Sequence, residues 1–324
     1  MYRLPALPLL LALAAASLLS VWFSLNTGSA PVDIREAIRT PDSTAARILW
    51  ELRLPRTAAA FVTGALLGLA GALMQVLLRN PLADPYVLGV SGGASFGALL
   101  ALLAGAGTAA LQGSAFAGAL LSTLLVFSLA HGRGSWDTTR LLLTGVVLAA
   151  GWGAMISLLL ALSPAQQMQG MLFWLMGDLS YAQLPVAGTA GLLVVAVTAI
   201  FLSPSLNVMA GGELYAAARG VAVNKVRTLI YLLGALATAL AVTQAGNIGF
   251  VGLVAPHLLR LAGARDHRVL IPAVILLGGT LLLCADALSR SLIAPRQLPV
   301  GVLTALIGVP MFLFLLYRSR RPDG

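Results

Sequence analysis

Charged residues are scarce in this chain. Only 10% of its 324 residues are Asp, Glu, Lys or Arg, whereas 59% are hydrophobic. About a quarter of residues are charged in an ordinary soluble domain, so the composition excludes that class and indicates an integral membrane protein made mostly of helices. Cysteine is scarcer still. Cys284 is the single one and cannot form an internal disulfide, so we interpret it as a small packing residue.

A phosphate-binding loop is also missing. The sequence contains no G-x-x-x-x-G-K-[ST] pattern, so this chain does not itself cradle the phosphates of ATP. No second His, Cys or carboxylate lies at metal-ligand spacing from His257, which we therefore interpret as a packing residue. The sequence predicts no catalytic residue, no metal site and no cofactor, and any energy for transport must come from a partner or an ion gradient.

Long apolar segments make up most of the chain. A helix needs about 20 apolar residues to cross a bilayer. Hydropathy supports eight to ten crossings, and we predict ten, in an all-α polytopic fold with one transmembrane domain over residues 1–324. The first segment is longer than the core of a signal peptide, so we interpret it as a spanning helix. The segments are 4–25, 57–78, 86–104, 109–130, 141–162, 184–202, 228–245, 249–262, 269–288 and 299–317.

Basic residues cluster in the short loops between these segments. A net charge of +9 would suggest nucleic acid as the partner of a soluble protein, but here the positive-inside tendency explains it better, and we expect no nucleic acid. The tendency places both termini in the cytoplasm. The 26–56 segment would then lie outside, where we expect a solvated connector. For Arg53, Arg56 and Arg290, each at the mouth of a span, an acidic docking partner is at least as plausible as solvation.

The second apolar segment ends in a break that lipid-facing helix does not tolerate. Arg79-Asn80-Pro81 and Asp84-Pro85 follow it directly. Two prolines remove backbone donors and push the preceding residues out of helical geometry. Such backbone survives at membrane depth only where protein or water satisfies its polar groups. The sequence therefore predicts that this loop belongs to a transport path.

A second polar loop covers residues 211–227. Glu213–Arg219 has helical propensity, Gly220 can take the positive φ that ends a helix, and another short helix could begin at Val223. Two short helices with small side chains such as Ala217 would fit a groove on a partner. A plain connector explains the loop about equally well.

Two further polar groups have local interpretations. Asp286 lies four residues before Arg290, the favourable order for an ion pair on a helix, so we predict that it orients Arg290 rather than carrying protons. Asp137, Thr138 and Thr139 precede an apolar segment where N-cap residues belong, and capping is about as plausible there as a gating role.

The whole chain resembles the permease subunit of the ATP-binding-cassette (ABC) importers that take up vitamin B12, iron–siderophores and haem. The resemblance covers most of the chain in family order. The matching stretches are RLPRTAAAFVTGALLGLAGALMQ, RNPLADPYVLGVSGGASFGA, FWLMGDLS, GFVGLVAPHLLRLAGARDHR and LPVGVLTALIGVPMFLFLL.

This resemblance implies a homodimer of ten-helix subunits in the bacterial inner membrane. Two ATPase subunits would lie on the cytoplasmic side, and a periplasmic substrate-binding protein would dock on the other. It also implies roles at matching positions. Arg53, Arg56 and Arg290 match arginines that dock the binding protein. Asn80, Leu82, Thr138 and Thr139 match residues of the cytoplasmic gate, and Glu213, Ala217, Arg219 and Gly220 lie in the stretch that matches the paired coupling helices on the ATPase.

Two other classes of protein remain as alternatives. An ion-coupled secondary transporter usually needs ionisable groups at mid-membrane, and besides Asp286 the chain offers few. An intramembrane serine protease could use Ser91 in Gly89-Val90-Ser91-Gly92 with His257, but a four-residue match in a glycine-rich chain is weak support. Siderophore, haem and B12 importers share the motifs above, so the sequence does not select the substrate.

Overall fold

The computed structural model describes residues 6–28, 30, 32–130, 138–180 and 182–319. These residues form helices and connecting loops and contain no strand. The first half comprises α1 (Ala6–Asn26), α2 (Ile34–Arg39), α3 (Thr44–Arg47), the π-helix η1 (Ile48–Arg53), α4 (Leu54–Leu77), the 3-10 helix η2 (Pro85–Leu88), α5 (Val90–Leu103) and α6 (Thr108–Ala130). The second half comprises α7 (Thr138–Leu162), α8 (Ala165–Leu175), α9 (Val186–Met209), α10 (Glu213–Ala218), α11 (Val223–Ala245), α12 (Val251–Leu261), α13 (His267–Ser291) and α14 (Val300–Ser319).

Each of the ten apolar segments predicted from the sequence coincides with one of these helices. Among the described residues, seven helices are long and apolar enough to cross a membrane, and α5, α12 and part of α14 form shorter apolar helices. The shortest, α12, has 11 residues. At about 1.5 Å per residue it is roughly 16 Å long, about half of the ~30 Å hydrocarbon core. The 249–262 segment therefore does not cross as a full-length helix.

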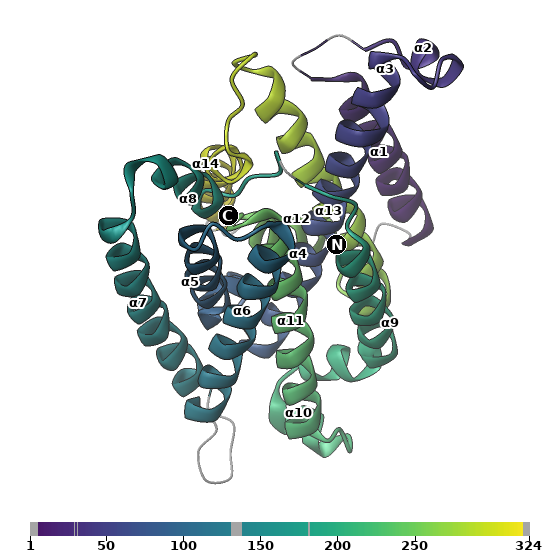
Figure 1. Ribbon diagram of the computed structural model, residues 1–324. Helices are drawn as coiled ribbons and strands as arrows, with labels where there is room; N and C mark the ends of the chain where they lie inside the picture. Colours follow the sequence, from purple (N-terminus) through teal and green to yellow (C-terminus); the bar gives the residue numbers. More distant parts are fainter. Residues whose placement is uncertain (1–5, 29, 31, 131–137, 181, 320–324) are drawn as a thin grey trace.

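Helix α4 is the centre of the bundle (Figure 1). In its most apolar window, 94% of residues are buried, compared with 11% in α1 and in α7. Glycines allow neighbouring backbones to approach it closely. A Cβ added to Gly64 would lie 2.2 Å from the Gly278 carbonyl oxygen of α13, and one added to Gly71 would lie 1.7 Å from that of Gly252 in α12. The small-residue stripe of α4 thus packs helix on helix, as such spacing predicts in lipid.

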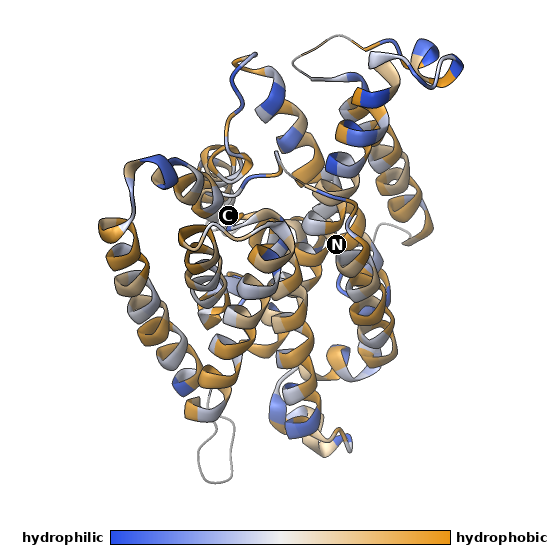
Figure 2. Cartoon of the chain, viewed as in Figure 1, coloured by the Kyte–Doolittle hydropathy of each residue, from blue (hydrophilic) through white to orange (hydrophobic). Residues whose placement is uncertain are grey.

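The outer helices carry an apolar surface. Hydrophobic residues cover the spans, and hydrophilic ones gather at the ends of the bundle (Figure 2). Leu18 of α1 is 72% exposed and Val147 of α7 is 69% exposed. Exposed apolar area on this scale marks a membrane or protein interface rather than a surface in water.

The short elements agree only in part with the sequence expectation. The 26–56 connector contains α2 and α3, whose arginines are exposed as expected. Helix α8 was not predicted, because its three glutamines break the apolar run on which the segment assignment relied. The second short helix expected from Val223 is wrong as a separate element. Val223 instead begins the first turn of α11, which is 23 residues long in total. The helix does not stop because the apolar pattern of the span follows this turn without a break.

Candidate functional site

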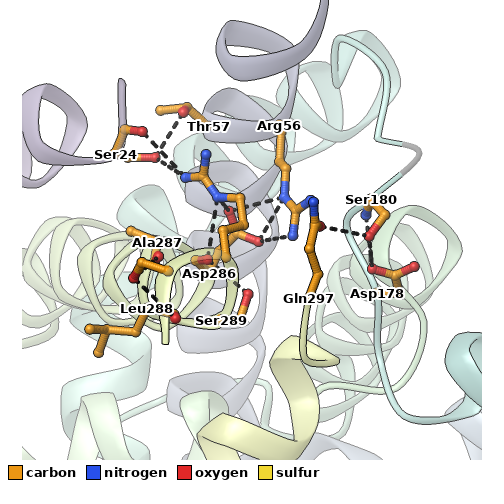
Figure 3. A network of polar contacts seen from close by, with 12 residues as sticks. Ser24, Arg56, Thr57, Asp178, Ser180, Asp286, Ala287, Leu288, Ser289 and Gln297 are labelled. Carbon is orange, nitrogen blue, oxygen red and sulfur yellow. Dashed lines mark hydrogen bonds and ion pairs between the residues drawn. The ribbon is translucent and has the colours of Figure 1, made fainter. Parts of the chain in front are cut away.

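Three arginines meet at the end of the bundle where α4 begins and α13 ends. Arg53 closes η1, Arg56 lies in the first turn of α4, and Arg290 lies in the last turn of α13. Asp286, which is 0% exposed, lies between two of them. The Nε of Arg56 donates to Oδ1 of Asp286 at 2.9 Å (Figure 3). The Nε of Arg290 lies 3.1 Å from Oδ2 of the same carboxylate. One carboxylate thus serves two guanidinium groups, and we call these four residues the arginine cluster.

The predicted pairing of Asp286 with Arg290 is confirmed. Its second partner, Arg56, was not foreseen, because it lies 230 residues away in the sequence. Of the two interpretations left open for these arginines, solvation does not hold, since Arg53, Arg56 and Arg290 are only 4%, 7% and 4% exposed; the docking role stays a prediction. Each is satisfied from within the chain, as an arginine buried among apolar helices must be.

Arg53 and Arg290 also donate hydrogen bonds to uncharged oxygens of α1 and of the loop that follows it. The guanidinium of Arg53 donates to the carbonyl oxygens of Leu25 at 2.6 Å and Ala30 at 2.5 Å. Arg290 donates to the hydroxyl of Ser24 at 2.8 Å. Three positive side chains surround one negative one, so the arginine cluster carries an excess of positive charge.

A row of polar contacts leads away from the arginine cluster (Figure 3). Arg56 donates from Nη1 to Oε1 of Gln297 at 2.6 Å, in the loop between α13 and α14. The hydroxyl of Ser180 lies 3.3 Å from the same oxygen and donates to Oδ1 of Asp178 at 2.6 Å. The row therefore connects α4 to the loop between α8 and α9.

The proline-broken loop lies at the other end of α4. Arg79 takes a φ of 47°, a left-handed conformation that ends the helix. The side chain of Asn80 accepts a hydrogen bond from the backbone N–H of Leu82 at 2.9 Å, and both residues are exposed. Asp84 accepts from the backbone N–H of Tyr86 at 2.8 Å. Burial raises the pKa of the Asp84 carboxyl, against the opposite effect of that hydrogen bond.

A second ionic group ties this loop to the rest of the same face. Glu213, the first residue of α10, forms ion pairs with Arg79 and with Arg227 of α11. Nη2 of Arg227 lies 3.3 Å from the hydroxyl of Thr138, the first residue of α7. We call Arg79, Thr138, Glu213 and Arg227 the Glu213 cluster. The Glu213 cluster thus contains one predicted gate residue, Thr138, and one predicted coupling residue, Glu213, and Arg227 contacts both.

The remaining predicted residues lie around the Glu213 cluster. Thr139 is exposed beside Thr138, and Asp137 lies outside the described residues. Ala217, Arg219 and Gly220 are exposed on and after α10, which projects from the end of the bundle opposite α2 and α3 (Figure 1). Gly220 has a φ of 79° and ends the helical turn, as predicted.

Helix α10 exposes apolar side chains in a polar loop between the spans α9 and α11. Leu214 is 90% exposed and Tyr215 is 46% exposed. The guanidinium of Arg219 lies 4.4 Å from the centre of the Tyr215 ring and leaves the rest of this surface open. Sequence reasoning assigned the helix but not these two residues, although a Leu in so polar a loop is a readable signal.

The residues of the proposed serine protease do not form a site. The ring of His257 packs edge-on against Phe312, with centroids 5.8 Å apart, which confirms its interpretation as a packing residue. No hydrogen bond joins His257 to Ser91, although both are described. Within the described part of the chain, no three His, Cys, Asp or Glu side chains gather in a metal-binding group.

Comparison with known proteins extends over nearly the whole chain. Residues 13–318 match the FecCD transport family. The vitamin B12 import system permease protein BtuC of Salmonella typhi is 39% identical over 323 residues, covering 96% of this chain and 95% of that protein. The ABC transporter permease protein YvrB of Bacillus subtilis (strain 168) is 40% identical over 295 residues, covering 88% and 83%.

Solved structures agree on the fold. A metal-chelate type ABC transporter in an inward-facing conformation matches with a TM-score of 0.85 and 30% identity, covering 97% of this chain and 99% of that chain. The PsaBC structure from Streptococcus pneumoniae matches with a TM-score of 0.56 and 18% identity over 87% and 95%, which supports the fold alone. The chain belongs to the FecCD transport family and is the permease subunit of an ABC importer.

Proposed function

We propose that the protein moves a metal chelate or a cobalamin from the periplasm to the cytoplasm, powered by ATP hydrolysis on separate subunits. The observation that carries the proposal is the match over residues 13–318, together with relatives of 39–40% identity among vitamin B12 importers. In this proposal the chain is not an enzyme. It works as a homodimer in the bacterial inner membrane, with both termini in the cytoplasm.

The arginine cluster is proposed to dock the periplasmic substrate-binding protein. Arg53 is the best placed of the three, because its partners are two neutral carbonyl oxygens rather than a carboxylate. An incoming carboxylate would add a full negative charge and could accept two parallel hydrogen bonds from the guanidinium, which a single carbonyl oxygen cannot do. Asp286 keeps Arg56 and Arg290 in place, so the cluster remains ordered and positive while Arg53 exchanges partners.

The Glu213 cluster is proposed to couple the ATPase to the gate. Leu214, Tyr215 and Ala217 form an exposed surface on α10 that fits a groove on an ATPase subunit. Movement of α10 acts directly on Glu213, whose carboxylate holds Arg79 at the start of the proline-broken loop and Arg227 beside Thr138. A displacement of the coupling helix therefore reaches the Asn80–Leu82 segment and the start of α7 together.

An ion-coupled secondary transporter is the second candidate. It would need a mid-membrane acid that exchanges protons with water, and Asp286 is instead 0% exposed and forms ion pairs with Arg56 and Arg290. Uptake that stops when ATP is depleted, but persists when the proton gradient is collapsed, supports the ABC mechanism. The opposite pattern contradicts it.

Docking is tested by reversing charge in the arginine cluster. Arg53→Glu is expected to weaken binding of the purified substrate-binding protein to the permease–ATPase complex in nanodiscs by at least tenfold, because one attractive ion pair becomes a repulsive one. Arg39→Glu is the matched control, since Arg39 is exposed on α2 and has the same charge. Equal affinity of wild type and Arg53→Glu, with the variant folded, would remove the docking role.

A further inference from the structure

An amide-lined cavity lies at the end of the bundle that carries the arginine cluster. It has a volume of about 450 Å³, within the range of about 300–1,000 Å³ typical of small-molecule pockets. Four helices contribute to it, namely the end of α5, the start of α6, α8 and the end of α11. Four glutamines line it, which are Gln112, Gln166, Gln169 and Gln244.

The chemistry of this lining is unusual for a bundle that is otherwise apolar. A primary amide both donates and accepts hydrogen bonds and carries no charge. The rings of Phe173 and Trp174 add apolar area between the amides. Among the described residues that line the cavity, Asp178 is the only charged one, and its Oδ1 already accepts from the N–H and the hydroxyl of Ser180.

A buried hydroxyl also lacks a partner at this cavity. Thr243 lines the wall next to Gln244, and its Oγ1 is buried with no hydrogen-bond partner among the described residues. A buried hydroxyl left unpaired costs about 1–3 kcal/mol. This oxygen is closed to solvent, so a ligand group would reach it only after the Thr243 side chain rotates toward the cavity.

The cavity is continuous with the proposed docking surface. Asp178 and Ser180 belong both to its wall and to the row of contacts that passes through Gln297 to Arg56. The cavity therefore lies beside the surface on which we propose that the substrate-binding protein docks.

We propose that the cavity is an entry subsite for a solute whose periphery carries uncharged carboxamides, as that of vitamin B12 does. The proposal rests on the proposed function and names its substrate class. Glutamine amides pair reciprocally with carboxamides, and the aromatic rings contact the apolar body between them. A solute rich in carboxylates would find no basic side chain among the described lining residues. A cavity of this volume holds one edge of a large macrocycle rather than the whole solute.

The test uses the permease reconstituted in proteoliposomes with its ATPase and its substrate-binding protein. Uptake of radiolabelled cyanocobalamin is measured at saturating binding protein for wild type and for Gln112→Leu/Gln169→Leu. Loss of one neutral hydrogen bond corresponds to about a three- to tenfold change. We expect the double variant to lower the maximal uptake rate at least fivefold, with docking affinity and ATPase activity unchanged.

A control and a second probe make the result decisive. Gln167→Leu is the matched control, because Gln167 lies on the same helix but does not line the cavity. A cyanocobalamin derivative with one carboxamide hydrolysed to a carboxylate should enter more slowly than the parent in wild type, and the double variant should reduce that preference. Unchanged uptake in the double variant overturns the subsite. ATP-driven uptake of haem, a dicarboxylate, but not of cyanocobalamin by the wild type also overturns it, while it leaves the importer function intact.

Discussion

Replacing Asp286 with Asn should destabilise the protein more than any other single change in the arginine cluster. The substitution removes the negative charge from a side chain that is 0% exposed and serves both Arg56 and Arg290. Breaking one buried ion pair by removing a partner costs about 3–5 kcal/mol, because the other charge remains buried and unpaired. Asp286→Asn leaves two such charges, so we expect the upper end of that range.

The melting temperature of the purified permease in detergent measures this effect. At roughly 2 °C per kcal/mol for a chain of this size, the loss corresponds to a shift of about 10 °C. Arg290→Met is the informative comparison, because it leaves the pair of Arg56 with Asp286 intact and replaces a long side chain with an apolar one. The reasoning predicts a smaller shift for Arg290→Met than for Asp286→Asn. Equal shifts, or a shift below 2 °C for Asp286→Asn, would refute it.

Three further predictions concern other parts of the chain. Glu213→Gln should lower ATP-driven uptake at least tenfold while the ATPase remains bound, because the carboxylate that holds Arg79 and Arg227 loses its charge; uptake at the wild-type rate would argue against the coupling role. Gly71→Leu should destabilise the bundle by about 1–3 kcal/mol, since its Cβ would lie 1.7 Å from a carbonyl oxygen. Gly113→Leu, where nothing lies within 4 Å of an added Cβ, is its control in the same melting assay. Ser91→Ala should leave uptake unchanged, and a complete loss would revive the protease hypothesis.

Local patterns explain what could be predicted from the sequence. The apolar segments predicted each of the seven long apolar helices of the described residues, because length and hydropathy can be read from consecutive residues. Asp286 and Arg290 were paired for the same reason, since four residues on a helix bring two side chains to one face. Glu213 was placed correctly at the start of a short helix.

Contacts between distant segments explain what could not be predicted. Nothing in the sequence near Arg56 indicates that its carboxylate lies 230 residues away. The two arginines on Glu213 come from the ends of α4 and α11, which only the packed bundle brings together. The sequence did not predict the burial of the three arginines, because their acceptors come from other segments. Arg53 and Arg290 donate to α1 and its following loop. Arg56 donates to Asp286 and Gln297.

The most direct test of the account is uphill solute uptake by the purified permease in vesicles, with and without its partners. We predict no accumulation by the permease alone, and accumulation only when the ATPase, the substrate-binding protein and ATP are all present, even with the proton gradient collapsed. Accumulation against a gradient by this chain with no second polypeptide would contradict the account.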